Sequence, residues 1–310
     1  MSLIGLAAVL AVALPAEAQA PLGTRAAGLA GAFVGVADDA SAVYWNPAGL
    51  ATGAIVSFLA TFSEENIPGN NLQAVAGERL AGRMVALSLP PVGLAYYRLS
   101  AFGTERVAPA VIGAPSREEV RRSVQPLTTS TVGVSLLQSL TEYIVVGATP
   151  KVVHGGNSTA FDVDAGVMIA VERVRVGLVA RNLTGPAFAV AMAGRPDGEI
   201  ELSREVRMGA AWGSGLPGYS RVMVSVDGDL TSRATPSGDR RDVAAGVETW
   251  WRDRRLGLRG GVRASTIGGS RAAVAAGLSA GLTPGTLLEA HVVQGQRDER
   301  GWSIGVRMGF

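Results

Sequence analysis

The chain has 310 residues, of which 47% are hydrophobic and 17% are charged, with a formal net charge of +2. This composition is apolar for a soluble protein, and no basic run interleaved with aromatic residues supports binding of nucleic acid. Because the chain has no cysteine, thiol catalysis, disulfide bonds and cysteine-ligated zinc are excluded.

The chain begins with an apolar run over residues 3–14, followed by Pro15 and the small-residue stretch Ala16-Glu17-Ala18-Gln19-Ala20. The run is too short to span a bilayer as a helix, and the small residues after it are typical of a secretory cleavage site. We therefore predict a signal peptide over residues 1–18, and a buried N-terminal helix is the alternative interpretation.

The next segment, residues 19–53, is rich in glycine and alanine and does not alternate like a strand. Asp38 or Asp39 could cap a short helical turn, and Asn46-Pro47 marks a break in the chain. An asparagine can hydrogen-bond to backbone groups and a proline fixes φ, so this part of the segment is expected to adopt a defined turn.

From residue 54 onward the sequence divides into short segments with a period of two, separated by turn residues. None is long enough for a membrane helix, whereas alternation is typical of strands that face lipid on one side and a lumen on the other. The fourteen predicted strands are 54–63, 82–89, 92–100, 127–138, 143–154, 159–171, 174–183, 201–213, 219–230, 241–251, 255–265, 270–282, 286–295 and 301–310. The fold class is therefore all-β, a 14-stranded antiparallel transmembrane β-barrel over residues 54–310.

The connections between these strands support the same fold. One set is short throughout, and the other contains the long segments 64–81, 101–126, 184–200 and 231–240, which is the asymmetry of an outer-membrane barrel. Neighbouring aromatic residues such as Trp250 and Trp251 fall at predicted periplasmic strand ends and predict an interfacial girdle. A barrel this wide would hold an aqueous channel, so residues 19–53 are expected to form a plug, or hatch, inside it.

Two sequence motifs in this plug carry a family resemblance. Ala37-Asp38-Asp39-Ala40 and Asn46-Pro47-Ala48 resemble the N-terminal hatch of the FadL/TodX-type outer-membrane transporters of long-chain fatty acids and aromatic hydrocarbons. The longer Tyr44-Trp45-Asn46-Pro47-Ala48-Gly49-Leu50 is similar to the PorV/PorQ branch, whose members include components of a protein secretion system. The resemblance implies a bacterial outer-membrane location and a plug that moves to open a path to the periplasm.

Carried over to this chain, the resemblance makes Asp38 and Asp39 anchors of the plug. The plug and gate residues that it implies are Asp38, Asp39, Tyr44, Trp45, Asn46, Pro47, Ala48 and Gly49. A structural turn that only shapes the plug is an equally good interpretation of the same residues.

The polar faces of the predicted strands carry both signs of charge. The residues expected to line the lumen are Asp162, Asp164, Arg207, Asp227, Asp229, Glu248, Arg259, Arg263 and Arg307. Mixed charges inside a barrel form ion pairs, and they favour a plugged, braced lumen over a strongly ion-selective pore.

Catalytic motifs have weak support. The G-x-S-x-G pattern occurs around Ser279 and around Ser303, but neither match has the strand-turn-helix context that gives the motif meaning. His291 and Glu289 share a strand face and could form a lumenal pair, although solvated lumen residues are the simpler interpretation. We expect no enzyme activity, no metal and no cofactor.

The sequence therefore favours passive transport of hydrophobic small molecules, fatty acids or hydrocarbons, through a plugged barrel. The alternative is a PorV-like component of a protein secretion system. The expected partners are outer-membrane lipid, the barrel-assembly machinery acting through the terminal Phe310, and either a hydrophobic ligand or secretion-system proteins. No nucleic-acid partner is expected.

Overall fold

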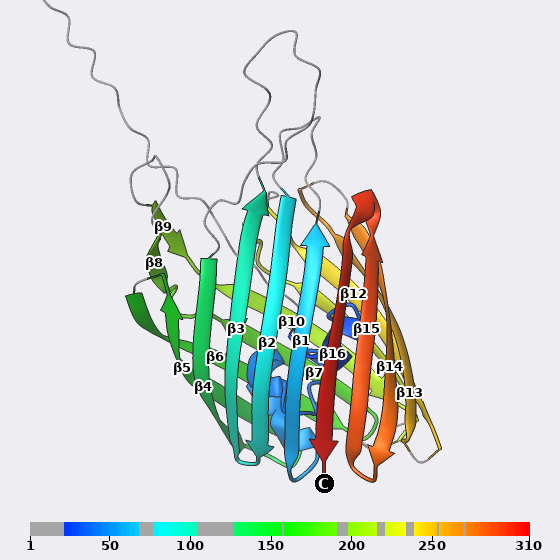
Figure 1. The fold of residues 1–310 in the computed structure, drawn as a ribbon. Coiled ribbons are helices and arrows are strands. Elements are labelled where there is room, and N and C mark those ends of the chain that lie inside the picture. Colours follow the sequence, from blue (N-terminus) through cyan, green and yellow to red (C-terminus); the bar gives the residue numbers. More distant parts are fainter. Residues whose placement is uncertain are drawn as a thin grey trace, which may run out of the picture.

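The computed structural model describes residues 22–67, 77–104, 127–156, 158–190, 198–215, 221–233, 239–252, 254–268 and 271–310. Within these residues fourteen antiparallel strands form a closed barrel (Figure 1). The first and last strands close it, in a register that runs from Ser57 opposite Gly309 to Asn66 opposite Arg300. The predicted all-β barrel is confirmed, whereas the predicted signal peptide 1–18 lies outside the described residues.

Each predicted strand corresponds to one strand of the barrel. In chain order these are β1 (Ser57–Ile67), β2 (Gly77–Leu89), β3 (Val92–Thr104), β4 (Leu127–Ser139), β5 (Ile144–Gly155), β6 (Ser158–Val171), β7 (Val174–Arg181), β10 (Glu205–Gly213), β11 (Val222–Asp229), β12 (Asp242–Trp251), β13 (Leu256–Ser265), β14 (Ala272–Thr283), β15 (Thr286–Gly295) and β16 (Arg300–Gly309). A short 3-10 helix, η3 (Gln296–Asp298), precedes the last strand.

Some predicted strand ends were wrong. The β2–β3 hairpin reaches outward to Gly77 and Thr104, beyond the predicted segments 82–89 and 92–100. The strand predicted from residue 201 begins only at Glu205, because residues before it form a separate two-stranded sheet. This sheet pairs β8 (Ala187–Val190) with β9 (Gly198–Glu201), within a connection that we expected to be a loop.

Successive residues of each strand alternate between the outer surface of the barrel and the lumen. On β12, Val247 and Trp251 are 46% and 44% exposed, whereas Glu248 and Trp250 are 1% and 4% exposed. Because adjacent residues of a strand point to opposite faces, Trp250 and Trp251 cannot share a girdle. The expected place of Trp250 in the aromatic girdle was therefore wrong, and its ring faces the lumen.

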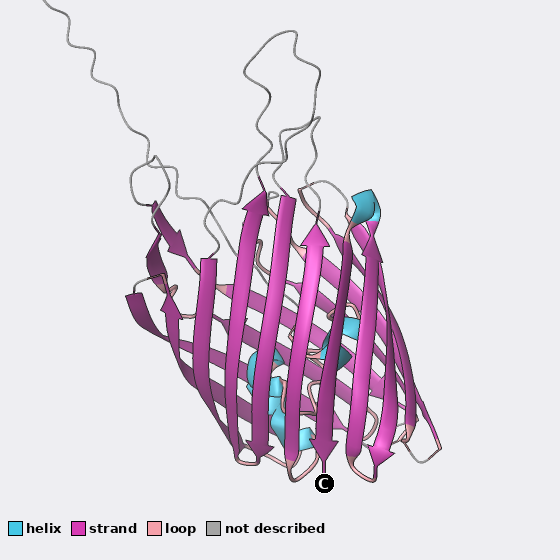
Figure 2. Cartoon of the chain, in the orientation of Figure 1, coloured by secondary structure: helices cyan, strands magenta, loops and turns pink. Residues whose placement is uncertain are grey.

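Residues 22–53, which we call the plug segment, lie inside the barrel (Figure 2). The segment contains α1 (Thr24–Gly28), α2 (Ala42–Trp45) and the 3-10 helix η1 (Pro47–Thr52), and residues 22–50 are all buried. Helices this short are not stable alone, so packing against the barrel must hold them. Within the described part of the chain, no helix has the length and hydropathy needed to cross a membrane.

Lumen-facing glycines let the plug backbone touch the wall directly. A Cβ on Gly147 would lie 2.6 Å from the backbone nitrogen of Ala48, and one on Gly261 would lie 2.7 Å from that of Ala30. Close contacts with plug backbone atoms occur at five glycines of the described wall, Gly147, Gly177, Gly209, Gly246 and Gly261. Any larger side chain at these positions would push the plug segment away from the strand behind it.

Candidate functional site

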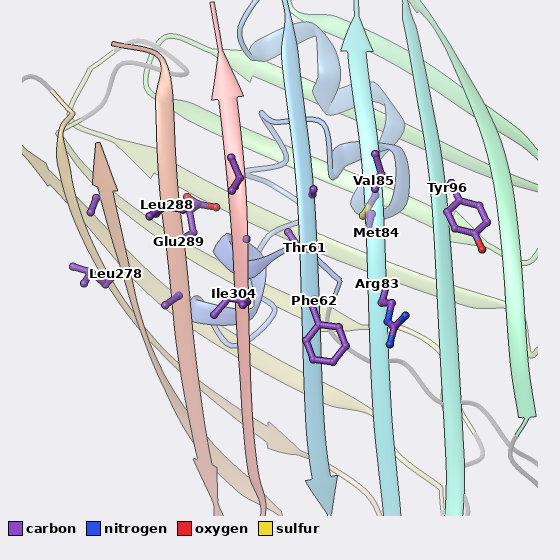
Figure 3. A pocket seen from close by; sticks show the side chains of 15 residues that line it. Thr61, Phe62, Arg83, Met84, Val85, Tyr96, Leu278, Leu288, Glu289 and Ile304 are labelled. Carbon is purple, nitrogen blue, oxygen red and sulfur yellow. The ribbon is translucent and has the colours of Figure 1, made fainter. Parts of the chain in front are cut away.

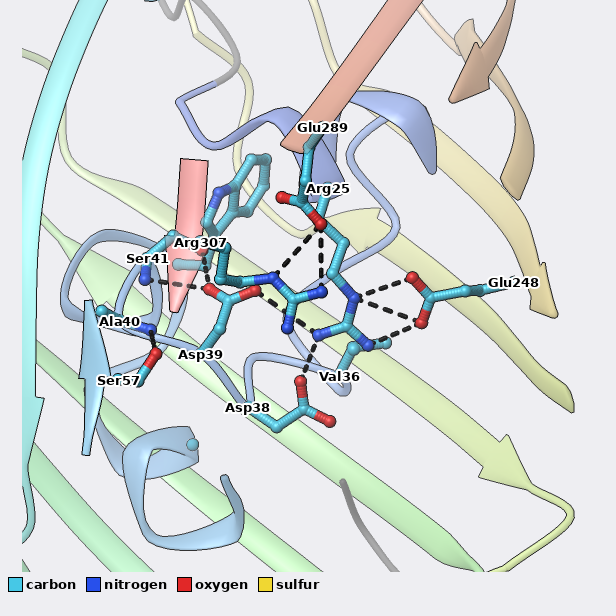
Figure 4. A network of polar contacts seen from close by, with 12 residues as sticks. Arg25, Val36, Asp38, Asp39, Ala40, Ser41, Ser57, Glu248, Glu289 and Arg307 are labelled. Carbon is cyan, nitrogen blue, oxygen red and sulfur yellow. Dashed lines mark hydrogen bonds and ion pairs between the residues drawn. The ribbon is translucent and has the colours of Figure 1, made fainter. Parts of the chain in front are cut away.

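The candidate site is the plug segment together with the lumenal side chains that hold it. Arg25 of α1 lies at the centre of a buried charge network (Figure 4). Its Nε donates to Glu248 Oε1 at 2.8 Å and its Nη2 donates to Glu248 Oε2 at 2.6 Å. Its Nη1 donates to Asp38 and, at 3.4 Å, to Asp39. Arg25 thus joins two parts of the plug segment to β12 by a bidentate pair, the strongest geometry for this type of contact.

Burial and neighbouring charges have opposite effects on the pKa values of Arg25 and Asp38. Burial alone would lower the pKa of Arg25, but Asp38 and Glu248 outweigh it, and the pKa is raised well above its ordinary value. Burial likewise favours the neutral form of Asp38, yet Arg25 and Arg175 hold the pKa of this carboxyl well below its usual range. Removing one partner of a buried, hydrogen-bonded pair costs about 3–5 kcal/mol, because it leaves an uncompensated charge.

Asp38 and Asp39, the expected anchors, both belong to this network. Asp38 Oδ2 also pairs with Arg175 Nη1 of β7 at 3.2 Å, and the same nitrogen donates to the carbonyl of Val36 at 2.8 Å. Asp39 Oδ1 accepts a hydrogen bond from the backbone nitrogen of Ser41 at 2.9 Å. The two carboxylates connect the turn before α2 to β7 through Arg175 and to β12 through Arg25 and Glu248, and their role as anchors stays a prediction.

A second set of contacts holds the backbone between α1 and α2. Asp227 Oδ2 of β11 accepts hydrogen bonds from the backbone nitrogens of Phe33 and Val34, both at 2.8 Å. Ser225 Oγ donates to the carbonyl of Ala32 at 2.8 Å. These lumenal side chains satisfy buried backbone groups that have no helix or sheet partner, so the loop can remain buried without a desolvation penalty.

Asn46 has the most specific hydrogen bonding of the predicted gate residues. Its Oδ1 accepts from the backbone nitrogen of Ala48 at 3.2 Å and so caps η1, and Pro47 occupies the first position of that helix. Its Nδ2 donates to the carbonyls of Val34 at 3.2 Å and Val167 of β6 at 3.1 Å. One side chain thus connects the turn, the rest of the plug segment and the barrel wall.

The other predicted gate residues are packed inside the plug. Tyr44 and Trp45 are 6% and 5% exposed, with ring centroids 5.6 Å apart in an edge-to-face arrangement. Trp45 Nε1 donates to the carbonyl of Leu22 at 2.7 Å. Ala48 is fully buried, and Gly49 lies so close to the backbone of Ala37 that a Cβ would not fit. Tyr44 and Trp45 therefore contribute to the core and face no external partner.

The structure places all the predicted lumen-lining charges inside the barrel, each with an opposite charge. Lys151 Nζ lies 3.1 Å from Asp162 and 2.6 Å from Asp164. The remaining pairs are Arg207 with Asp227 and Asp229, Arg259 with Glu248, Arg263 with Glu299, and Arg307 with Glu289. These side chains form a braced interior in which charge is neutralised locally.

The sequence interpretation missed Arg25 and Lys151 as members of the site. Arg25 is the only basic residue between residues 22 and 53, and it lies among apolar neighbours. A lone cation in such a segment needs a counter-charge when buried, and that requirement was the available signal.

The possible catalytic pairs do not assemble into a triad. His291 Nδ1 lies 2.5 Å from Ser303 Oγ, but Glu289 bonds instead to Ser279 and Arg307. Among the described residues, no cluster of histidine, aspartate or glutamate has the geometry of a metal site.

A cavity of about 1090 Å³ lies at the end of the barrel that holds Phe310, next to the plug segment. The residues that border it include Asp38 and Gly53 of the plug segment and Arg254 and Phe310 of the rest of the chain.

The fold and site together define the class: a closed β-barrel whose lumen is filled by its own N-terminal segment. Three solved structures resemble the chain in fold. The CymD monoaromatic hydrocarbon channel has a TM-score of 0.64 at 12% identity, covering 93% of this chain and 97% of the channel. A FadL homologue of Pseudomonas aeruginosa has a TM-score of 0.61 at 11% identity, covering 92% and 97%.

The Pseudomonas putida toluene transporter TodX has a TM-score of 0.53 at 10% identity, covering 86% of this chain and 92% of the transporter. The family model described as "F plasmid transfer operon, TraF, protein" matches residues 154–229. No curated protein sequence matches the chain. The expected resemblance to the FadL/TodX-type superfamily is therefore confirmed at the level of the fold.

Proposed function

We propose that this protein is a passive transporter of hydrophobic small molecules, fatty acids or hydrocarbons, across the bacterial outer membrane. The observation that carries the proposal is a buried plug segment inside a barrel with the fold of a hydrocarbon channel and a toluene transporter. The apolar outward faces of the strands and the short connections at the end that holds Phe310 support this location.

Transport requires a path past the plug segment. Residues 46–49, which we call the gate segment, lie between the lumen wall and the rest of the plug. If the gate segment moves, the bonds from Asn46 to Val34 and Val167 break, and the contact of Ala48 with Gly147 is released. The ligand then reaches the cavity at the end of the barrel that holds Phe310 and moves down its gradient without an energy source. While the gate segment moves, the charge network around Arg25 keeps α1 bound to the barrel wall.

A second candidate function is a PorV-like component of a protein secretion system. One observation favours it: residues 22–50 are all buried and are held by buried ion pairs as well as hydrogen bonds. A plug that stays in place is compatible with a barrel whose outer surface binds other proteins.

Ligand identification separates the two candidates. The full chain is purified from outer membranes in mild detergent, and native mass spectrometry with lipid extraction identifies bound molecules. Transport predicts a bound fatty acid or hydrocarbon that is lost in the variant Asn46→Ala/Pro47→Ala and kept in the control Asn66→Ala, which changes an exposed asparagine of β1. An empty barrel that co-purifies with a stoichiometric protein partner contradicts transport and supports the secretion role.

A further inference from the structure

Two arginines lie side by side on the outer wall of the barrel. Arg83 of β2 and Arg98 of β3 are both exposed and are directly opposite each other in the ladder between these strands. Their outward-facing neighbours toward the periplasm are Val85 and Tyr96, which are 47% and 46% exposed. The pair therefore belongs to the surface that faces lipid.

Charged side chains are unusual at the depth in the membrane at which these two arginines lie. β2 and β3 have 13 residues each, and Arg83 and Arg98 stand at their midpoints. With a rise of about 3.3 Å per residue and a tilt of about 40°, the midpoint lies roughly 15 Å above the periplasmic end. The apolar band of such barrels is about 25 Å tall, so both arginines originate within it. Charged groups at this depth are unfavourable unless an anion or water meets them.

The charges of the pair are not neutralised by the described chain. Like charges directly opposite each other in a sheet repel. The neighbouring Arg79 pairs with Glu64 at 3.3 Å, but among the described residues no carboxylate forms an ion pair with Arg83 or Arg98. Arg83 instead lies over the ring of Phe62, with its Cζ 5.3 Å from the centroid. The pair thus presents two guanidinium groups to whatever covers this face.

An apolar groove of about 800 Å³ begins beside Arg83 and extends across β1, β16 and β15 to β14 (Figure 3). The floor of the groove is low where the outward-facing side chains are small, at Ala60, Ala280 and Ala290. Larger side chains such as Ile304 and Leu288 stand between them. One cross-strand row connects the groove directly to the charges, in the order Leu278, Ala290, Ile304, Phe62, Arg83 and Arg98. A molecule with an apolar chain and an anionic head would cover both features at once.

The geometry points to a binding site for a phosphate-bearing lipid of the outer leaflet, with an acyl chain in the groove and the phosphate between Arg83 and Arg98. Guanidinium groups bind phosphate oxygens in bidentate pairs, and a shared phosphate removes the repulsion between the two charges. A second copy of the chain is a poorer occupant at the arginine pair itself, because a two-fold contact centred there would place the arginines of one copy against those of the other. This inference rests on the outer-membrane location proposed above but does not depend on transport.

The test measures lipid binding to the purified full-length barrel by native mass spectrometry after delipidation. The probes are diphosphorylated lipid A, the same lipid after dephosphorylation, and phosphatidylcholine. We expect selective retention of the phosphorylated form and at least a tenfold loss of that affinity in Arg83→Gln/Arg98→Gln. The control Arg79→Gln removes a charge from the same face and should leave binding unchanged. Filling the groove with Ala290→Trp should weaken binding while both arginines remain.

Heat-modifiable migration of each variant establishes that the barrel has folded. Equal retention of phosphorylated and dephosphorylated lipid A, or undiminished binding by the double arginine variant, would overturn the proposal. A stoichiometric protein or second copy on this face would overturn it as well. Failure of ligand uptake would leave this result unaffected, so the two proposals fail separately.

Discussion

Replacing Gly147 by alanine tests whether the wall holds the plug segment by close backbone contact. A Cβ at this position would lie 2.6 Å from the nitrogen of Ala48 and 2.8 Å from the carbonyl carbon of Pro47. Both are backbone atoms, so no side-chain rotation can relieve the overlap. The gate segment must move away from β5, or the strand must bend.

The expected magnitude follows from overpacking. An extra methyl group in a tightly packed interior costs about 1–3 kcal/mol. The matched control is Gly260→Ala on β13, where a Cβ would meet only the carbonyl oxygen of Ala275 at 3.8 Å. Glycine to alanine at an unstrained site stabilises by about 0.4–1 kcal/mol through the unfolded state. Both variants share this unfolded-state effect, so they should differ by the overpacking cost alone, about 1–3 kcal/mol.

Two assays read the effect. Equilibrium urea unfolding of the refolded barrel gives the free energy, and trypsin reports release of the plug segment. Arg25 is the only tryptic site between residues 22 and 53, and it is buried. Cleavage after it therefore requires the plug segment to move out of its position in the barrel. We expect faster cleavage in Gly147→Ala than in the wild type or in Gly260→Ala. Equal unfolding midpoints and equal cleavage rates in the two variants would refute the contact argument.

Three further predictions concern the anchors, the gate and assembly. Arg25 and Arg175 outweigh burial and hold the folded pKa of Asp38 below its unfolded value, so its stabilisation is present above a pH of about 4 and is lost as the pH falls further. The unfolding midpoint should drop in that window, and Asp38→Asn should flatten the dependence. Asn46→Ala removes the bonds to Val34 and Val167 and should raise basal conductance in planar bilayers, whereas conductance at the wild-type level would count against a gate. Removal of the Phe310 side chain by Phe310→Ala should lower the heat-modifiable fraction in cells, and an unchanged fraction would contradict recognition of the terminus by the assembly machinery.

The strands could be predicted from the sequence because apolar residues recur at every second position along them. From Trp302 to Phe310, every second residue is apolar, and the structure places this face outward. The pattern weakens at the far end of the β2–β3 hairpin, where Gly77-Glu78-Arg79 and Gly103-Thr104 interrupt the alternation of apolar residues, and those strand ends were therefore predicted too short. The β8–β9 hairpin was missed because strands of four residues carry almost no periodicity.

The site was predictable only in part. The motif around Asn46 identifies the turn, but no local pattern shows that its amide reaches the carbonyl of Val167, 121 residues along the chain. The pairing of Arg25 with Glu248 spans 223 residues and could equally have involved any lumenal carboxylate. The glycine contacts were hidden for a different reason: within an alternating strand, a glycine that touches the plug, such as Gly147, resembles one that faces open space, such as Gly260.

The most direct test of transport through plug movement is ligand uptake with the plug held in place. The chain has no cysteine, so the pair Val43→Cys/Thr149→Cys can be introduced where the hydroxyl of Thr149 lies 3.5 Å from the carbonyl of Val43, next to the gate segment. Proteoliposomes containing this variant are compared before and after oxidation, with labelled toluene or oleate as ligand. The account predicts that oxidation stops uptake and that reduction restores it. Equal uptake in the oxidised and reduced barrels would contradict it.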